Sequence, residues 1–565
     1  MVTQLASHDW PSGGRPVPSV NPWCKYGFHE KPACCYASAN EPDSTPVKQN
    51  NMSNEEIPGH LPRGRACQAC RNRKMKCDGN QPVCNQCVRF KRENECIFVP
   101  GPAPSNSRML EQEIRRLENQ IRELELRNGR LQLPEALNSP SLFPANWWEA
   151  AEPPRNVGQT LAQVFLLHAS KFGFFLDVHR FVASFVGSVG TGSRIPALLR
   201  NTIYLWGVHI IPGQGVHEDI FLRRALQCLP QALSANDDIM HAIQAEILLA
   251  YYFFECNRLL EGQQHVSGAL SLARSCKLHK FGPGPHAPNA ALPPALDSTE
   301  EQMRVNAWWQ LFALEKAWTT ALDTPSLITE RRADSVIDTP WPRDQQGNQS
   351  AYGQTVQKFL ANVRSDRTND PLAFYAKASV LYEQAAYAAS LLGHTAAGAD
   401  VNNMVVGLDA SIEYFKKIIP VLGQPDAASA AVRHDLLVIH TLAQCATIAL
   451  HKSSAGRSMT SLLRCITAAN TIVNIFNAVP LEGLAPVNPI IAFTAFAAHE
   501  VIVSTFIMVR GNPTAAAGLP NEGVLLFGMG VLKGLFSFFA GTGVRSPLFE
   551  HHLSKVCAAQ QPIFG

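Results

Sequence analysis

Residues 63–100 read RGRACQACRNRKMKCDGNQPVCNQCVRFKRENECIFVP, and this stretch decides the architecture of the N-terminal part of the chain. It holds six of the fifteen cysteines of the 565-residue sequence: Cys67, Cys70, Cys77, Cys84, Cys87 and Cys96. Their spacing, C-x2-C-x6-C-x6-C-x2-C-x8-C, divides into two similar halves with no histidine between them. So dense a cluster in a long chain indicates either metal ligands or a disulfide-linked module.

The first residues of the sequence help to choose between these two readings. The segment MVTQLASHDWPSGG has no basic region followed by an apolar run, which argues against a signal peptide and for a reducing compartment. We therefore interpret the cysteines as metal ligands. A tetrahedral zinc ion takes four ligands, so two ions need eight ligand positions from six sulfurs, and two sulfurs must bridge. Cys67 and Cys84 head the two halves and are the expected bridging pair.

The same stretch closely resembles the fungal Zn2Cys6 binuclear-cluster family of transcription factors. The resemblance rests on the cysteine spacing, on the C-R-x-R-K-x-K-C-D core at residues 70–78 and on the proline two residues before the fourth cysteine. It implies that the six cysteines hold two zinc ions and that the module presents a helix to the major groove of double-stranded DNA. It also implies that Arg73 and Lys74 read a CGG triplet, since basic side chains bind the edge of guanine.

Positive charge is concentrated in this part of the chain. The formal charge is +6 over residues 61–95, against +3 for the whole sequence. The residues expected to contact DNA are Arg71, Arg73, Lys74 and Lys76 on a short helical turn of the first half, and Arg89, Lys91 and Arg92 at the equivalent place in the second. All except Arg73 and Lys74 are assigned to phosphates, where they add affinity and salt dependence. A merely solvated charged face is the alternative for any one of them.

A heptad pattern occupies residues 110–133. Isoleucine at the a positions and leucine at every d position favour a parallel two-stranded coiled coil, in which a polar residue at one a position fixes the register. The predicted dimerisation seam is Leu110, Ile114, Leu117, Ile121, Leu124, Asn128 and Leu131. Since only about three heptads are present, an amphipathic helix packed on its own domain is the alternative.

The charges that flank this seam bear on the choice of partner. Glu113 would face Glu118 of the partner strand, a like-charge contact that costs only a few tenths of a kcal/mol when exposed. We therefore expect a homodimer, with a heterodimer left open. Two clusters on one symmetric stalk would bind two half-sites.

From about residue 160 the sequence is typical of long apolar helices separated by polar loops, which predicts an all-α domain of about 400 residues. Residues 243–280 and 304–328 resemble the fungal-specific transcription factor domain, or middle homology region, of the same family. The resemblance implies a regulatory role for this domain. Ser298 with Glu301 is a candidate capping box that opens a helix in its second motif.

Three tryptophans on that helix, Trp308, Trp309 and Trp318, are expected in the core rather than around an effector. The stretch from Ile490 to Val509 is long enough to span a bilayer, but His499 and Glu500 in its middle favour a buried core helix, so we expect no membrane contact.

The expected fold class is mostly α, with a small binuclear cluster, a short parallel coiled coil and a large all-α regulatory domain. The predicted division is a disordered N-terminal segment at 1–62, the Zn2Cys6 DNA-binding domain at 63–100, a linker at 101–109, the coiled coil at 110–133, a second linker at 134–160 that carries an exposed Trp147-Trp148 pair, and the helical domain at 161–565.

No P-loop, nucleophile elbow, HExxH helix or dinucleotide-binding glycine motif occurs in the sequence, so we expect no enzyme. These observations predict a nuclear, sequence-specific transcription factor of the RNA polymerase II type that binds DNA as a dimer. Two alternatives stay open. One is a zinc-cluster co-regulator that acts through protein contacts, and the other is a metabolite-sensing regulator whose helical domain binds a small effector.

Overall fold

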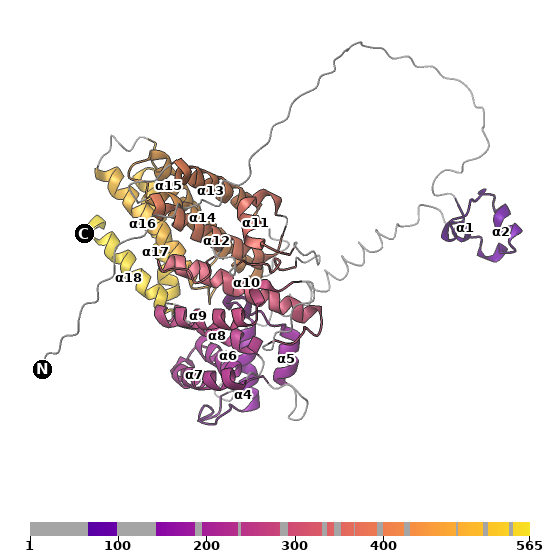
Figure 1. The fold of residues 1–565 in the computed structure, drawn as a ribbon, viewed down its shortest axis with the longest axis horizontal. Coiled ribbons are helices and arrows are strands. Elements are labelled where there is room, and N and C mark those ends of the chain that lie inside the picture. The colour runs from indigo at the N-terminus through magenta and orange to yellow at the C-terminus, as the bar shows by residue number, and fades with distance from the viewer. Residues whose placement is uncertain are drawn as a thin grey trace, which may run out of the picture. The chain divides into compact units, whose positions relative to one another are not determined.

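Helices form nearly all of the regular secondary structure in the computed structural model, and the part of the chain that it describes contains no β-strand (Figure 1). The mostly-α fold class is thus confirmed. The described residues are 66–98, 143–186, 195–235, 239–282, 292–329, 336–343, 352–366, 368–392, 399–422, 430–481, 484–511, 518–541 and 546–564. The predicted disordered segment at 1–62 and the predicted coiled coil at 110–133, with its seven seam residues, lie outside these ranges.

The chain divides into two compact units, residues 1–130 and 131–565. In the first unit the described elements are α1 (Gln68–Asn72), α2 (Asn85–Arg89) and the 3-10 helix η1 (Glu93–Glu95). Apart from Ala69, the buried apolar residues within 66–98 are all cysteines. So short a segment cannot bury enough apolar surface to fold by the hydrophobic effect alone, and such modules depend on metals or disulfides.

The second unit is a large helical body with one continuous hydrophobic core. Its N-terminal part contains α4 (Arg155–Leu166), η3 (Ala169–Phe172), α5 (Val178–Val186), α6 (Ala197–Ile210), η4 (Gly215–His217), α7 (Glu218–Ala235), α8 (Ile239–Glu255), α9 (Leu259–Ser275) and η5 (Leu278–Lys280). The apolar periods predicted around residues 243–254 and 266–273 correspond to α8 and α9.

The long helix α10 (Ser298–Ala321) connects the two parts of the body and packs against α8, α9, α12 and α16. In Figure 1, α4 to α8 lie below α10 and α12 to α15 lie above it. The three tryptophans of α10 are all at most 1% exposed, as expected for core residues. The capping prediction was one residue out: Asp297 is the N-cap, and its carboxylate accepts from the amide of Glu300 at 3.0 Å. Aspartate is as good a cap as serine, and here Ser298 is the first helical residue.

The C-terminal part of the body continues the helix-after-helix arrangement. It contains α11 (Thr355–Ala361), η7 (Val363–Ser365), α12 (Pro371–Leu392), α13 (Ala399–Ile418), α14 (Ala430–Lys452), α15 (Met459–Ala478), α16 (Ile490–Gly511), α17 (Glu522–Gly541) and α18 (Pro547–Phe564). Here α12 packs on α14, α14 on α15, and α16 on α17 and α18.

Three of these helices, α15, α16 and α17, are long and apolar enough to cross a membrane by length and composition. The most apolar stretch of α16 is 67% buried inside the body. His499 is buried and lies 3.1 Å from the Gln560 amide of α18, whereas Glu500 reaches the surface of the body and accepts from Lys452 of α14 at 2.8 Å. The expectation of a buried core helix over Ile490–Val509 therefore agrees with the packing of α16.

The segment that precedes α4 also belongs to the helical body. Trp147 was expected to be exposed in a linker, but it is 3% exposed and its ring stacks on Phe221 of α7 at a centroid distance of 5.7 Å. Trp148 stacks on His217 at 4.1 Å. The expectation of an exposed pair was wrong because two large aromatic surfaces gain more from burial than a polar, proline-rich neighbourhood suggests.

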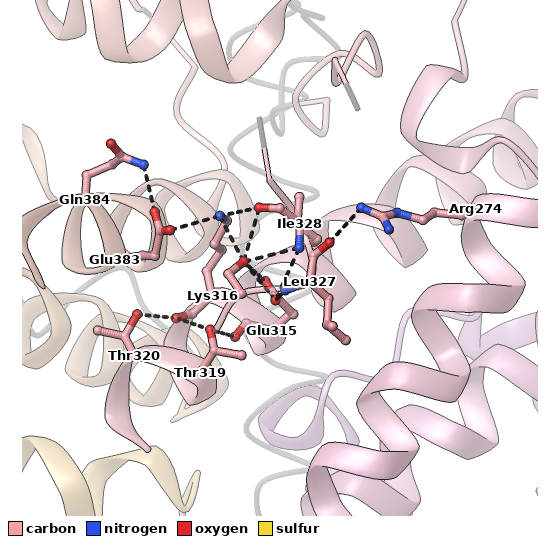
Figure 2. Close-up of polar contacts among 10 residues, drawn as sticks. Arg274, Glu315, Lys316, Thr319, Thr320, Leu327, Ile328, Glu383 and Gln384 are labelled. Atoms are coloured by element: carbon pink, nitrogen blue, oxygen red, sulfur yellow. Dashed lines mark hydrogen bonds and ion pairs between the residues drawn. The ribbon is translucent and has the colours of Figure 1, made fainter. Parts of the chain in front are cut away.

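A buried polar cluster fixes the segment that follows α10 (Figure 2). Glu315 is fully buried, and its carboxylate accepts from the amide of Leu327 at 2.5 Å. The Lys316 ammonium donates to the Ile328 carbonyl at 2.8 Å and lies 3.5 Å from a carboxylate oxygen of Glu383 on α12. Buried charges are tolerated only when they are paired and hydrogen-bonded, so this cluster specifies how the segment sits between α10 and α12.

Candidate metal centre and nucleic-acid interface

The two halves of the cysteine stretch form the same backbone structure twice. In each half the first cysteine is the N-cap of a five-residue helix, and its sulfur accepts from the amide of the second cysteine at 3.4 Å: Cys67 from Cys70, and Cys84 from Cys87. The amide of each first cysteine points at the third sulfur of its own half, at 3.5 Å in the first half and 3.2 Å in the second. The C-x2-C spacing produces this geometry because residues N-cap and N3 of a helix face each other.

This repetition brings all six cysteine sulfurs together. They fall into two groups of four, within each of which the sulfurs lie no more than 4.8 Å apart: Cys67, Cys70, Cys77 and Cys84, and Cys67, Cys84, Cys87 and Cys96. All six are free thiols rather than disulfides. Cys67 and Cys84 occur in both groups, which is the arrangement expected of a bridging pair.

The distances between sulfurs fit zinc. Cys67 and Cys84 lie 3.7 Å apart, Cys67 and Cys87 3.7 Å, and Cys70 and Cys84 3.6 Å. A tetrahedron with Zn–S bonds of about 2.3 Å has edges of about 3.8 Å. The sulfurs are therefore spaced for two tetrahedral sites that share one edge, and six thiolates with two Zn²⁺ ions carry a net charge of −2 that the surrounding basic residues offset.

The two shared cysteines have lowered pKa values. Burial, the largest single effect, raises the pKa of Cys67 and Cys84, but the amide that donates to each sulfur and the hydrogen bonds from neighbouring thiols together bring both pKa values below the ordinary value. Burial and the neighbouring sulfurs raise the pKa of Cys70, and raise that of Cys87 to about 12. Since zinc binds thiolates, its binding must release the protons that these thiols hold, and metal affinity will rise with pH.

The two short helices end before most of the basic residues, contrary to the prediction. Four of them were expected on one short helical turn, Arg71, Arg73, Lys74 and Lys76, but α1 ends at Asn72 and contains only Arg71. In the second half α2 contains Arg89, whereas Lys91 and Arg92 follow it. The helices stop because the chain must turn back to supply the third sulfur of each half. All of these basic side chains are exposed except Arg71, which is half-buried and donates to the Ala66 carbonyl at 3.2 Å.

Lys74 and Lys91 end their helices in the same way. Both have left-handed backbone, with φ of 54° and 53°. The next amide in each half then bonds back to the second cysteine, Met75 to the Cys70 carbonyl at 2.9 Å and Arg92 to the Cys87 carbonyl at 2.8 Å. This is the Schellman pattern, in which a left-handed residue closes the helix end. The reversal places an exposed lysine at the corner of each half.

The halves differ at the residue before that lysine. The helix C-cap is Arg73 in the first half and Phe90, 51% exposed, in the second. Arg73 forms an ion pair with Glu95 of η1, Nη1 to Oε2 at 2.9 Å. This pair could not be predicted from the sequence, because the two residues meet only when η1 folds back over the first half.

Comparison with known proteins identifies two regions of the chain. The family model described as the fungal Zn(2)-Cys(6) binuclear cluster domain matches residues 65–104, and the fungal specific transcription factor domain matches residues 199–390. Both families consist of transcription regulators rather than enzymes. The zinc cluster domain binds two zinc ions. No solved structure matches the chain.

Individual relatives match over short stretches. The chain is 54% identical over 33 residues, 6% of its length, to an uncharacterized transcriptional regulatory protein of Saccharomyces cerevisiae, of which the match covers 5%. It is 54% identical over 35 residues, again 6% of its length, to the transcription regulator galc of Aspergillus niger, covering 4% of that protein. It is 42% identical over 43 residues, 8% of its length, to the transcription factor FBD3 of Gibberella moniliformis, covering 6% of it.

Proposed function

We propose that the chain is a nuclear, sequence-specific transcription factor of the fungal Zn(2)-Cys(6) binuclear cluster type that binds double-stranded DNA through residues 66–98, since it matches the models of this cluster and of the fungal specific transcription factor domain. The proposal rests on the two groups of sulfurs, which share Cys67 and Cys84. The backbone around these groups exposes a left-handed lysine, Lys74 or Lys91, at the end of each helix. A rigid core that presents basic side chains loses little entropy when it binds a nucleic acid.

In this proposal one zinc ion is held by Cys67, Cys70, Cys77 and Cys84, and the other by Cys67, Cys84, Cys87 and Cys96. The metals supply the cross-links that replace a hydrophobic core in this unit. The chain's own contribution is the backbone that aims the side chains, above all the two Schellman turns.

The basic residues divide into two roles. Arg73 and Lys74, at the exposed corner of the first half, read a CGG triplet, because bidentate or paired donors to guanine O6 and N7 discriminate between bases. The contacts to phosphates come from Arg71, Lys76, Arg89, Lys91 and Arg92. Dimerisation is assigned to the predicted seam from Leu110 to Leu131, which would place two clusters on two half-sites.

Gel-shift titration of the full zinc-loaded chain on CGG-containing and scrambled DNA tests this proposal. Lys74→Ala should weaken binding to the CGG site by about 5- to 150-fold, equivalent to about 1–3 kcal/mol, and change binding to scrambled DNA little. Lys76→Ala is the matched control, because it removes the same charge from a phosphate contact and should weaken both DNAs alike. Equal losses from Lys74→Ala on both DNAs would contradict base reading. A wild-type chain that binds neither DNA would favour a co-regulator acting through protein contacts.

A further inference from the structure

An open pocket of about 440 Å³ lies between α13, α14 and α15 of the helical body, beyond the residues that match the transcription factor domain. Its volume is in the lower part of the range of about 300–1,000 Å³ that is typical of small-molecule sites. Most such sites are lined mainly by apolar side chains. Most of the residues that line this one carry polar or charged groups, although their carbon atoms contribute more of the exposed surface than their polar atoms do.

The charge of the lining is predominantly positive. Lys416, Lys417 and Arg464 face the pocket, against a single carboxylate, Glu413. Lys416 and Lys417 lie in the last turn of α13, where cations also balance the helix dipole. Arg464 lies in the second turn of α15, toward the N-terminal end where the helix dipole disfavours a cation, so the dipole does not account for the convergence of three cations.

The single carboxylate is already engaged. Glu413 lies 2.5 Å from the Lys416 ammonium and 3.2 Å from Arg464 Nη1. Arg464 Nη2 also donates to the Asp409 carboxylate at 2.8 Å, and the other oxygen of Asp409 lies 3.2 Å from His451 Nε2. Arg464 and Lys416 are thus oriented before anything binds. Lys417 is exposed and forms no hydrogen bond or ion pair with the rest of the described chain.

The remaining wall is rich in hydroxyl and amide groups. Four threonines line the pocket together with Gln444. The Lys416 ammonium donates to the buried Thr447 hydroxyl at 3.1 Å and to the Gln444 side-chain oxygen at 3.4 Å. The amide N–H groups of Gln444 thus stay available to donate to a ligand. Hydroxyl and amide groups at this density match a ligand with several hydroxyls of its own.

We propose that this pocket binds a small hydroxylated anion, with its carboxylate or phosphate group near Lys417 and Arg464 and its hydroxyls along the threonine wall. Arginine and lysine are the side chains that recognise these anions, and hydroxyl and amide groups of the wall can bond to the hydroxyls of the ligand. The proposal concerns the helical body alone and does not rest on DNA binding, so its failure would leave the DNA-binding proposal intact.

Isothermal titration of the full zinc-loaded chain tests this with four probes: 6-phosphogluconate, gluconate, glucose and inorganic phosphate. We expect 6-phosphogluconate and gluconate to bind at least tenfold more tightly than glucose, which lacks the anion, or phosphate, which lacks the hydroxyls. No binding of either acid at millimolar concentration, or equal affinity for glucose, would overturn the proposal.

Variants locate the site. Lys417→Met should weaken binding of both sugar acids at least fivefold, and it cannot fail by unfolding the body because this side chain has no partner in the described structure. Lys533→Met on α17 is the matched control, an exposed lysine that does not line the pocket, and it should leave affinity unchanged. Thr467→Val should weaken gluconate but not phosphate. Equal losses from Lys417→Met and Lys533→Met would refute the location.

Discussion

The ion pair between Arg73 and Glu95 leads to a specific prediction about DNA binding. In the structure Arg73, the proposed base reader, is engaged by a carboxylate of its own domain at 2.9 Å. To reach guanine it must leave Glu95, so the free energy of this pair is subtracted from that of binding. The substitution Glu95→Gln removes the competing charge and keeps the shape of the side chain.

The size of the effect follows from the exposure of the pair. The side chains of Arg73 and Glu95 are 41% and 55% exposed. Exposed pairs contribute about 0.2–1 kcal/mol, so Glu95→Gln should raise affinity for a CGG site by about 1.4- to 5-fold. The gain should shrink as salt is raised, since screening weakens both the pair and the general attraction to phosphates.

Fluorescence anisotropy at low salt, on CGG and scrambled DNA, measures this gain. Glu93→Gln is the matched control because it removes the same charge from the same 3-10 helix without forming an ion pair with Arg73. The effect of Glu95→Gln should exceed that of the control on CGG DNA only, and should vanish in an Arg73→Ala background. Weaker CGG binding by Glu95→Gln, or an equal gain in the Arg73→Ala background, would refute the idea that Glu95 competes with DNA for Arg73.

Three further predictions concern the metal and two buried carboxylates. Zinc removal with a chelator should make residues 66–98 sensitive to trypsin and abolish DNA binding while the helical body keeps its melting temperature; an intact cluster segment would contradict this. Glu315→Ala should lower the free energy of unfolding of the body by about 3 kcal/mol in urea, since it leaves the buried Leu327 amide and the Ser326 hydroxyl without their acceptor, and a loss below about 0.5 kcal/mol would contradict it. Burial raises the pKa of Glu255 to about 7, although the charge of His209 and a hydrogen bond from Ser546 act in the opposite direction. The stability that comes from protonated Glu255 is therefore fully present below pH 4.5 and is lost as the pH rises through 7. Glu255→Gln should therefore stabilise the body at pH 8 by up to about 3 kcal/mol and not at pH 4, and the same shift in melting temperature at both pH values would count against this assignment.

The two groups of cysteine sulfurs could be predicted from the sequence because the features that form them are local. Each C-x2-C pair spans one helical turn, and the near-repeat of the two halves indicated that Cys67 and Cys84 are equivalent. Helices such as α8 and α9 were predicted for a similar reason, since their apolar periods are long and regular. The N-cap of α10 was misplaced by one residue because Asp297 and Ser298 are both good caps, and only the backbone decides between them.

Features that depend on distant packing could not be predicted. Trp147 lies in a proline-rich segment without any period, and only the position of α7 makes it a core residue. The pocket residues Lys417 and Arg464 belong to helices that are separated in sequence by α14. A charged residue on an amphipathic helix looks the same in sequence whether its neighbour is solvent or another helix.

The internal symmetry of the cluster explains why the two halves need not do the same work. Both halves end their helix at a left-handed lysine, Lys74 or Lys91, so the backbone offers two equivalent corners. The C-cap before that lysine is Arg73 in one half and Phe90 in the other. A phenyl ring cannot donate to the edge of guanine, so the second half lacks the arginine–lysine pair that the first half has at its C-cap and left-handed positions. The second half keeps Arg89, Lys91 and Arg92, which the proposed function assigns to phosphates. On the proposed function, the duplicated half supplies the two metal sites, and the difference at the helix C-cap makes the first half the base reader and leaves the second half to contact phosphates.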